Sequence, residues 1–161
     1  MQRALIHFAF LLGATLSFAA PAAADKLTVS AAYVRLAPPG STVSAAYLVI
    51  RNSGTSDRQL VKAASPSAHS VELHEHRNEN DVMKMREVRS IAVKAGDQVE
   101  LKPGGYHLML INTQKALAEG DSVAITLRFD DGSRKEVAAK VRKVHTTTPV
   151  DATMNHGAMK H

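Results

Sequence analysis

The sequence predicts an all-β sandwich or barrel, and three observations lead to this fold class. After Asp25, short runs rich in β-branched and aromatic residues alternate with clusters of Gly, Pro, Asn, Asp and Ser, the pattern of strands separated by turns. No long segment keeps the 3.6-residue apolar period of a helix. About 137 residues follow the first 24, which is enough for one domain with a real core.

Ten runs are predicted as strands, and they cover residues 26–36, 43–51, 58–63, 69–75, 82–86, 90–93, 97–101, 106–111, 122–129 and 135–143. Turn signals separate them. One is Pro103-Gly104-Gly105, where proline presets φ and glycine accepts a positive φ. Residues 114–119 lack strand alternation, so we expect a short helical turn there. We find no internal repeat.

Residues 1–24 have the features of a secretory signal peptide. Arg3 supplies positive charge, residues 8–16 form an apolar run, and residues 22–24 are three alanines that suit a cleavage site. The run is too short to span a bilayer, so the alternative, an uncleaved membrane anchor, is disfavoured. We expect cleavage after Ala24, a folded domain over residues 25–143, and no membrane span after cleavage.

Composition excludes several classes of protein. The chain has no cysteine, which rules out disulfide scaffolds, thiolate metal sites, iron–sulfur clusters and blue-copper sites. The formal charge is +5, but the basic residues are scattered and aromatics make up 4%. Nucleic-acid binding needs a basic patch with stacking aromatics, so no nucleic-acid partner is expected. No nucleophilic triad, phosphate loop or pair of catalytic carboxylates stands out, and we expect a protein that is not an enzyme.

Methionine and histidine gather in the same few segments after Asp25. Alternate residues of a strand share a face, so three predicted strands each present a pair of such side chains: His74 with His76, Met83 with Met85, and His107 with Met109. Neighbouring strands lie ~4.8 Å apart, so these pairs can converge on one ion. Thioether sulfur selects Cu(I), whereas zinc prefers Cys, His and carboxylate. The pattern therefore predicts a Cu(I) site, although a single Met is usually core filler. His69 stands apart, and we assign it to the surface.

Four of these residues also carry a resemblance to a known family. The spacing His74-x10-Met85-x21-His107-x-Met109, within the phrases "VELHEH", "VMKMR" and "PGGYHLML", resembles the signature of the PCuAC family of periplasmic copper chaperones. The resemblance covers about residues 26–143. It implies a cupredoxin-like Greek-key β-sandwich that binds one Cu(I) through these four side chains. Met83 and His76 lie outside the signature; we expect Met83 to shield the site and His76 to be a partly exposed neighbour, the alternative being accessory metal ligands.

The resemblance further implies location in the periplasm and delivery of copper to the CuA centre in subunit II of cytochrome c oxidase, beside Sco-type proteins. We expect a monomer. The alternatives are a periplasmic copper-scavenging, storage or copper-resistance protein, and a copper redox enzyme, which would need an open coordination position and usually more histidine. A β-sandwich adhesin would leave the clustering of Met and His unexplained.

Residues 144–161 differ in composition from the domain. They contain almost no large aliphatic residues, so they cannot bury enough apolar surface to offset the entropy of ordering, and a flexible tail is predicted. Imidazole with backbone or terminal oxygen suits Cu(II), so we expect a separate Cu(II) site here, the alternative being incidental affinity. Its candidate ligands are His145, Met154, His156, Met159 and His161.

Overall fold

A computed structural model describes residues 26–80 and 82–144. The strands are β1 (Leu27–Arg35), β2 (Ser44–Asn52), β3 (Arg58–Ala64), β4 (Ala68–Glu79), β5 (Val82–Glu87), β6 (Ile91–Val93), β7 (Gln98–Leu101), β8 (Tyr106–Thr113), β9 (Ser122–Phe129) and β10 (Arg134–Arg142). The described residues contain no helix, which confirms the all-β class, and among them no helix could cross a membrane. The predicted signal peptide and all five candidate tail ligands lie outside the described residues.

The helical turn expected at residues 114–119 is wrong, because the segment forms bends and a tight turn instead. The Ala118 amide donates to the Asp121 carboxylate at 3.0 Å, and the Asp121 amide donates to the Ala118 carbonyl at 3.1 Å. Gly120 between them has a φ of 89°, which lies outside the right-handed helical region. The reciprocal hydrogen bonds and this left-handed residue close the turn just before β9.

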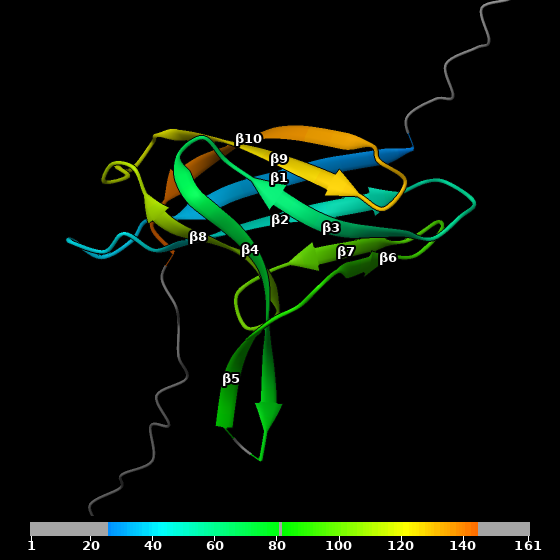
Figure 1. Cartoon of the computed structure of the whole chain (residues 1–161), viewed down its shortest axis with the longest axis horizontal. Helices are drawn as coiled ribbons and strands as arrows, with labels where there is room; N and C mark the ends of the chain where they lie inside the picture. Colours follow the sequence, from blue (N-terminus) through cyan, green and yellow to red (C-terminus); the bar gives the residue numbers. More distant parts are fainter. Residues whose placement is uncertain (1–25, 81, 145–161) are drawn as a thin grey trace, which may run out of the picture.

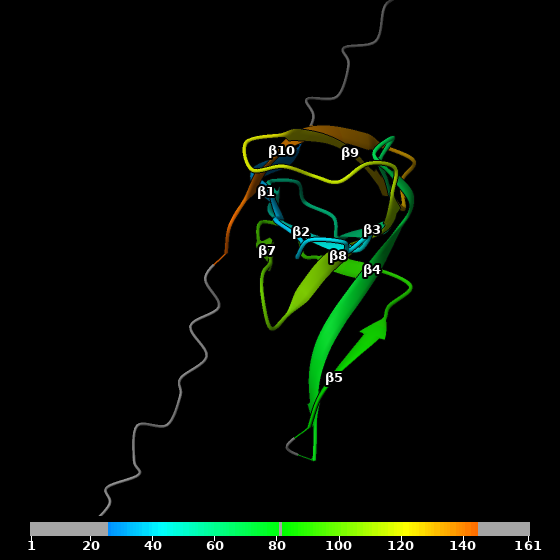
Figure 2. The same ribbon diagram turned by 90° about the vertical axis from the view of Figure 1, so that its left-hand side faces the viewer.

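The strands form one sheet that folds over on itself. Their order is β5-β4-β8-β2-β1-β10-β9-β3-β6, and β7 also pairs with β2. Figure 2 shows β9 and β10 in one layer above β2 and β8, with β1 at the side between them. Neighbours such as β4 and β8 are far apart in the chain, as Greek-key connections require. The result is the two-layered sandwich that the strand pattern predicted.

The core between the layers is built from aliphatic side chains and one phenylalanine. β9 illustrates the alternation: Val123, Ile125, Leu127 and Phe129 are buried and the residues between them are more exposed. Each buried side chain of this size contributes roughly 1.5–3 kcal/mol relative to an exposed one. Among the described residues the core contains no methionine, so the methionines of this chain do not serve as its gap-fillers.

The β4–β5 hairpin projects from the body of the sandwich (Figure 1 and Figure 2). β5 is the edge strand of the sheet, and all six of its residues are exposed. Asn80, in the turn, has a φ of 55°, a conformation that asparagine tolerates better than most residues. Glu79 accepts from Lys84 at 3.2 Å and from Arg86 at 2.8 Å. These ion pairs join the two strands of the hairpin near its tip.

Candidate metal centre

The pairing of β4 with both of its neighbours brings donor side chains from three strands onto one face of the sheet. His74 on β4 lies directly opposite His107 on β8, and His76 on β4 lies opposite Met85 on β5. Residues that are directly opposite in a pair share a face, as do alternate residues of one strand. Met109, two residues after His107, therefore faces the same side. The register thus places the four predicted ligands on one face of the sheet, on successive same-face positions near the base of the hairpin.

Burial changes steadily across this face. His107 is 1% exposed, because β8 is an inner strand flanked by β4 and β2. The His74 side chain is 13% exposed, whereas Met85 and Met83, on the edge strand, are 44% and 55% exposed. The site is therefore open on the side of the hairpin and closed on the side of the sandwich.

Hydrogen bonds fix which nitrogen of two imidazoles is free. The carboxylate of Glu72 can only accept, so His74 donates from Nε2 at 2.9 Å and its Nδ1 keeps a lone pair. The carbonyl of Gly105 likewise accepts from Nδ1 of His107 at 3.1 Å, which leaves the lone pair on Nε2. Both free nitrogens are buried and have no hydrogen-bond partner. Buried polar atoms are normally satisfied, so two such orphans on one face are ready to bind an ion.

The pKa of His107 supports the same chemistry. Burial lowers its pKa below the usual value, the nearby His76 and His74 lower it further, and the hydrogen bond to Gly105 opposes these effects. A lowered pKa keeps the imidazole neutral at physiological pH, and only a neutral imidazole can bind a metal. His107 is therefore held in the form that a ligand needs.

Aromatic rings cover the buried side of His107. The ring of Tyr47, which is 5% exposed, lies 6.3 Å from the His107 ring and 5.0 Å from that of Tyr33. The guanidinium of Arg142, at the end of β10, lies 3.5 Å from the centre of the Tyr33 ring, within the range of a cation–π contact. This row of rings lies against one side of His107 and connects the end of β10 to the candidate site.

His76 and Met83, which the signature does not use, share the same face. His76 is half-buried and its ring stacks on His107, with centroids 4.8 Å apart and a tilt of 25°. Its Nδ1 is the third buried imidazole nitrogen without a partner. Met83 lies opposite Asn78, beyond Met85 toward the tip of the hairpin. It therefore lies at the exposed end of the donor row.

Sequence reasoning missed Glu72 and Gly105, which form hydrogen bonds with the two histidines predicted as ligands, His74 and His107. Glu72 could have been found, because a carboxylate two residues before His74 shares its face. The carbonyl of Gly105 could not, because it depends on the turn that precedes β8. No group of three or more His, Asp or Glu side chains in the described part of the chain is placed to hold a metal ion. The further donors on this face are thioethers.

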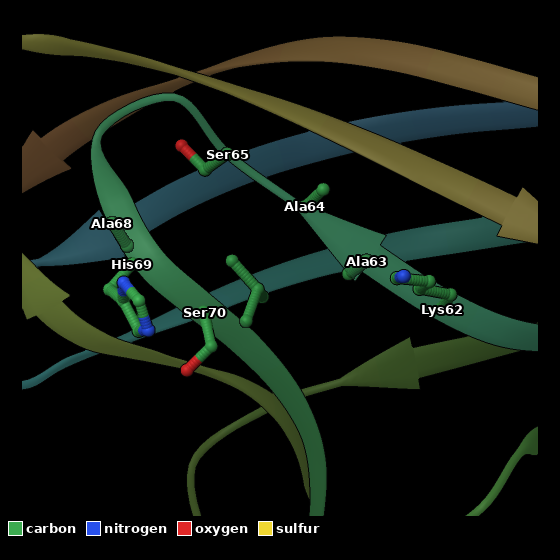
Figure 3. A pocket seen from close by; sticks show the side chains of 8 residues that line it. Lys62, Ala63, Ala64, Ser65, Ala68, His69 and Ser70 are labelled. Atoms are coloured by element: carbon green, nitrogen blue, oxygen red, sulfur yellow. The ribbon is translucent and has the colours of Figure 1, made fainter.

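His69 takes no part in this face. It lies near the start of β4, beside a shallow pocket of about 300 Å³ lined by residues 62–65 and 68–71 (Figure 3). His69 is exposed, in agreement with its assignment to the surface. The pocket contains none of the four predicted ligands.

Known proteins are similar to this chain in sequence. Residues 27–141 match the family model described as "Putative lipoprotein LpqE-like". A protein of Leifsonia xyli subsp. xyli that carries a lipoprotein description is 38% identical over 120 residues, which are 74% of this chain and 71% of the relative.

Two solved structures have a similar fold. A copper-bound PCuAC domain from PmoF2 superposes with a TM-score of 0.64 at 22% identity, over 74% of this chain and 95% of that domain. The solution structure of Cu(I)-DR1885 from Deinococcus radiodurans has a TM-score of 0.54 at 35% identity, over 70% of this chain and 75% of that one. The sandwich is thus the cupredoxin-like β fold of PCuAC domains, and the chain belongs to the LpqE-like family.

Proposed function

We propose that this protein is an exported copper chaperone that holds one Cu(I) through His74, Met85, His107 and Met109. The observation that carries the proposal is the pair of buried, unpartnered nitrogens on His74 and His107, on the face that also presents two thioethers. Two imidazoles and two thioethers form a borderline-to-soft donor set, which suits Cu(I) better than Zn, Mg or Ca. A relative 35% identical to this chain was solved with Cu(I), which supports the assignment.

The arrangement suits transfer rather than permanent storage. The rings of His107 and His74 are each held by a hydrogen bond, whereas Met85 lies on an exposed edge strand. An incoming ligand can therefore reach the metal from the hairpin side and displace the thioether first. We propose delivery to the CuA centre in subunit II of cytochrome c oxidase, with Sco-type proteins as further partners, from a periplasmic location.

The ligand set is tested by replacing each thioether separately. Met85→Leu and Met109→Leu keep side-chain volume and apolarity, so the fold should survive. Each should weaken Cu(I) binding by at least about tenfold, because even residues that only orient a ligand are worth about 10–100-fold. Anaerobic competition against a Cu(I) chelator measures the affinity. If both variants bind as tightly as the parent, the ligand assignment is wrong.

Transfer is tested by mixing the Cu(I)-loaded protein with apo subunit II of the oxidase and, separately, with an apo Sco-type protein. A chaperone should transfer its copper to at least one of them. The transfer should be faster than the spontaneous dissociation of Cu(I) from the protein, measured by trapping the released ion with a chelator. A scavenging or storage protein would retain its copper against both.

We propose further that the segment after residue 143 binds Cu(II), through His145, His156 and His161 together with backbone or terminal oxygens, with Met154 and Met159 between them. Cu(II) favours nitrogen and oxygen ligands in tetragonal geometry. Truncation after Lys143 should abolish Cu(II) binding and leave the Cu(I) equivalent in place. Full retention of Cu(II) binding by the truncated chain would exclude this role.

A further inference from the structure

The donor face carries more potential ligands than one Cu(I) needs. His76 and Met83 add a nitrogen and a sulfur to the four proposed ligands. His76 is opposite Met85, and Met83 follows one same-face step farther along β5. Same-face neighbours on a strand are about 6.6 Å apart. The donors therefore form a row that runs from buried His107 to exposed Met83, toward the tip of the projecting hairpin in Figure 1.

His76 differs from the other two imidazoles in the row because no hydrogen bond within the described residues holds its ring, which is positioned by stacking on His107. Its backbone amide donates to the carbonyl of Gly105 at 3.1 Å, which holds the strand in place. Neither ring nitrogen of His76 makes a hydrogen bond within the described residues, and its Nδ1 is buried without a partner. The ring can therefore turn without breaking a hydrogen bond. Such a side chain can bind a metal briefly and let it go.

The exposure of Met83 is that of an ordinary surface residue that does not pack against the core. It is 55% exposed, and its neighbour Val82 is 56% exposed. The two differ in direction, since Met83 shares the face of Met85 and Val82 faces the other way. Single exposed apolar residues are common, so exposure alone says little. The position of the sulfur, next along the row from a proposed ligand, is what distinguishes Met83.

We propose that Cu(I) enters and leaves the site along this row, with His76 and then Met83 as transient ligands between the four-ligand site and an acceptor. The proposal rests on the Cu(I) site described above. Each step forms one bond to copper as another breaks, and copper remains Cu(I), so no electron donor or acceptor takes part. A transient ligand lowers the barrier in both directions. It therefore changes the rates of loading and release without changing the affinity.

The test uses the chain from Asp25 to His161 and two variants, Met83→Leu and His76→Phe. Leucine keeps the volume of Met83 without the sulfur, and phenylalanine keeps a ring to stack on His107 without a nitrogen. Val82→Ala is the matched control for the first variant, because it changes an equally exposed side chain on the opposite face. His69→Phe is the matched control for the second, since it changes an exposed β4 histidine away from the row.

Stopped-flow capture of Cu(I) by bicinchoninate measures the release rate, and anaerobic equilibrium competition with the same chelator measures the affinity. Met83→Leu and His76→Phe should each slow capture by about tenfold, which corresponds to a rise of about 1.4 kcal/mol in the barrier to release. The dissociation constant for Cu(I) should stay within about threefold of the parent value, less than half of a tenfold step on a logarithmic scale. X-ray absorption should find the same number of sulfur neighbours on copper in the parent and in Met83→Leu. Both controls should behave like the parent.

Two results would overturn the proposal. Capture at the parent rate in either variant would remove that residue from the path. An affinity loss in Met83→Leu as large as that in Met85→Leu would make Met83 a permanent ligand. A parent protein that binds no Cu(I) would instead overturn the proposed function, so the two failures are distinguishable.

Discussion

Replacing Glu72 with glutamine tests the claim that this carboxylate sets the tautomer of His74. Glu72 accepts from Nε2 of His74 at 2.9 Å, so it keeps the proton away from Nδ1, the atom assigned to the metal. Glutamine has nearly the same shape but no charge. Its amide group can also turn to donate to Nε2, which would move the proton to Nδ1 and block the ligand.

The size of the effect follows from the hydrogen bond. A bond to a charged acceptor contributes about 1.5–3 kcal/mol and a neutral one about 0.5–1.5 kcal/mol, a difference of about 1 kcal/mol or slightly more. The Glu72 side chain is 34% exposed, so solvent screening favours the lower end of this range. About 1 kcal/mol corresponds to about fivefold in affinity. The blocked tautomer adds to this, and we expect Cu(I) binding to weaken by about tenfold, within the range for residues that orient ligands.

The assay is anaerobic competition for Cu(I) against a chelator, with thermal unfolding of the apo protein as a check on the fold. Glu75→Gln is the matched control. Glu75 lies on the same strand but on the opposite face, and it pairs with Arg77 at 3.1 Å. The Glu75→Gln variant should have the same Cu(I) affinity as the parent. Binding by Glu72→Gln within about twofold of the parent would refute the tautomer argument. An equal loss in both variants would point to a general charge effect instead.

Three further predictions concern the scaffold. Leu108→Ala removes a fully buried side chain and should lower the free energy of unfolding by about 2–5 kcal/mol in chemical denaturation; a loss below about 1 kcal/mol would show that this part of β8 can collapse around the cavity. Hydrogen bonds from Arg86 and then Lys84 lower the pKa of Glu79, so its stabilising contribution is present above the ordinary carboxyl pKa and is lost as pH falls through the lowered value. Glu79→Gln should therefore speed amide exchange in the β4–β5 hairpin near neutral pH, and the difference from the parent should vanish in acid. Gly104→Ala meets no atom within 4 Å but forces a side chain onto a φ of 81°, so it should cost about 1–2 kcal/mol of stability from backbone strain alone, measured by thermal unfolding.

Much of the fold could be predicted from local sequence because its strands are short and bounded by clear turn residues. β9 was predicted at the residues where it is found, since its alternation is regular. β4 was predicted to end at residue 75 but continues to Glu79. Its last residues are polar, and ion pairs with β5 rather than apolar burial hold them in the strand. Apolar alternation cannot reveal a strand segment whose side chains are all polar.

The placement of the candidate ligands could be predicted within each strand but not between strands. That His107 and Met109 share a face follows from the two-residue period of a strand. That His74 lies opposite His107, while Met85 lies opposite His76, depends on register between strands that are distant in the chain. Register is set by the packing of the other face, where Leu73 and Leu108 pair in the core. Which nitrogen of each imidazole is free depends instead on a partner two residues earlier in the chain, Glu72 for His74 and the Gly105 carbonyl for His107. The first follows from the two-residue period of a strand, whereas the second depends on the turn before β8.

The absence of any buried residue in β5 has a consequence for engineering. β4 and β8 each carry core residues between their donor side chains. Any shift of the backbone in these strands therefore disturbs both the packing of the core and the position of the donors. β5 contributes a donor without contributing to the core. We therefore expect that Met85 can be exchanged for histidine or cysteine with little effect on stability, so that the metal preference of the proposed site can be altered on this strand without changing the sandwich.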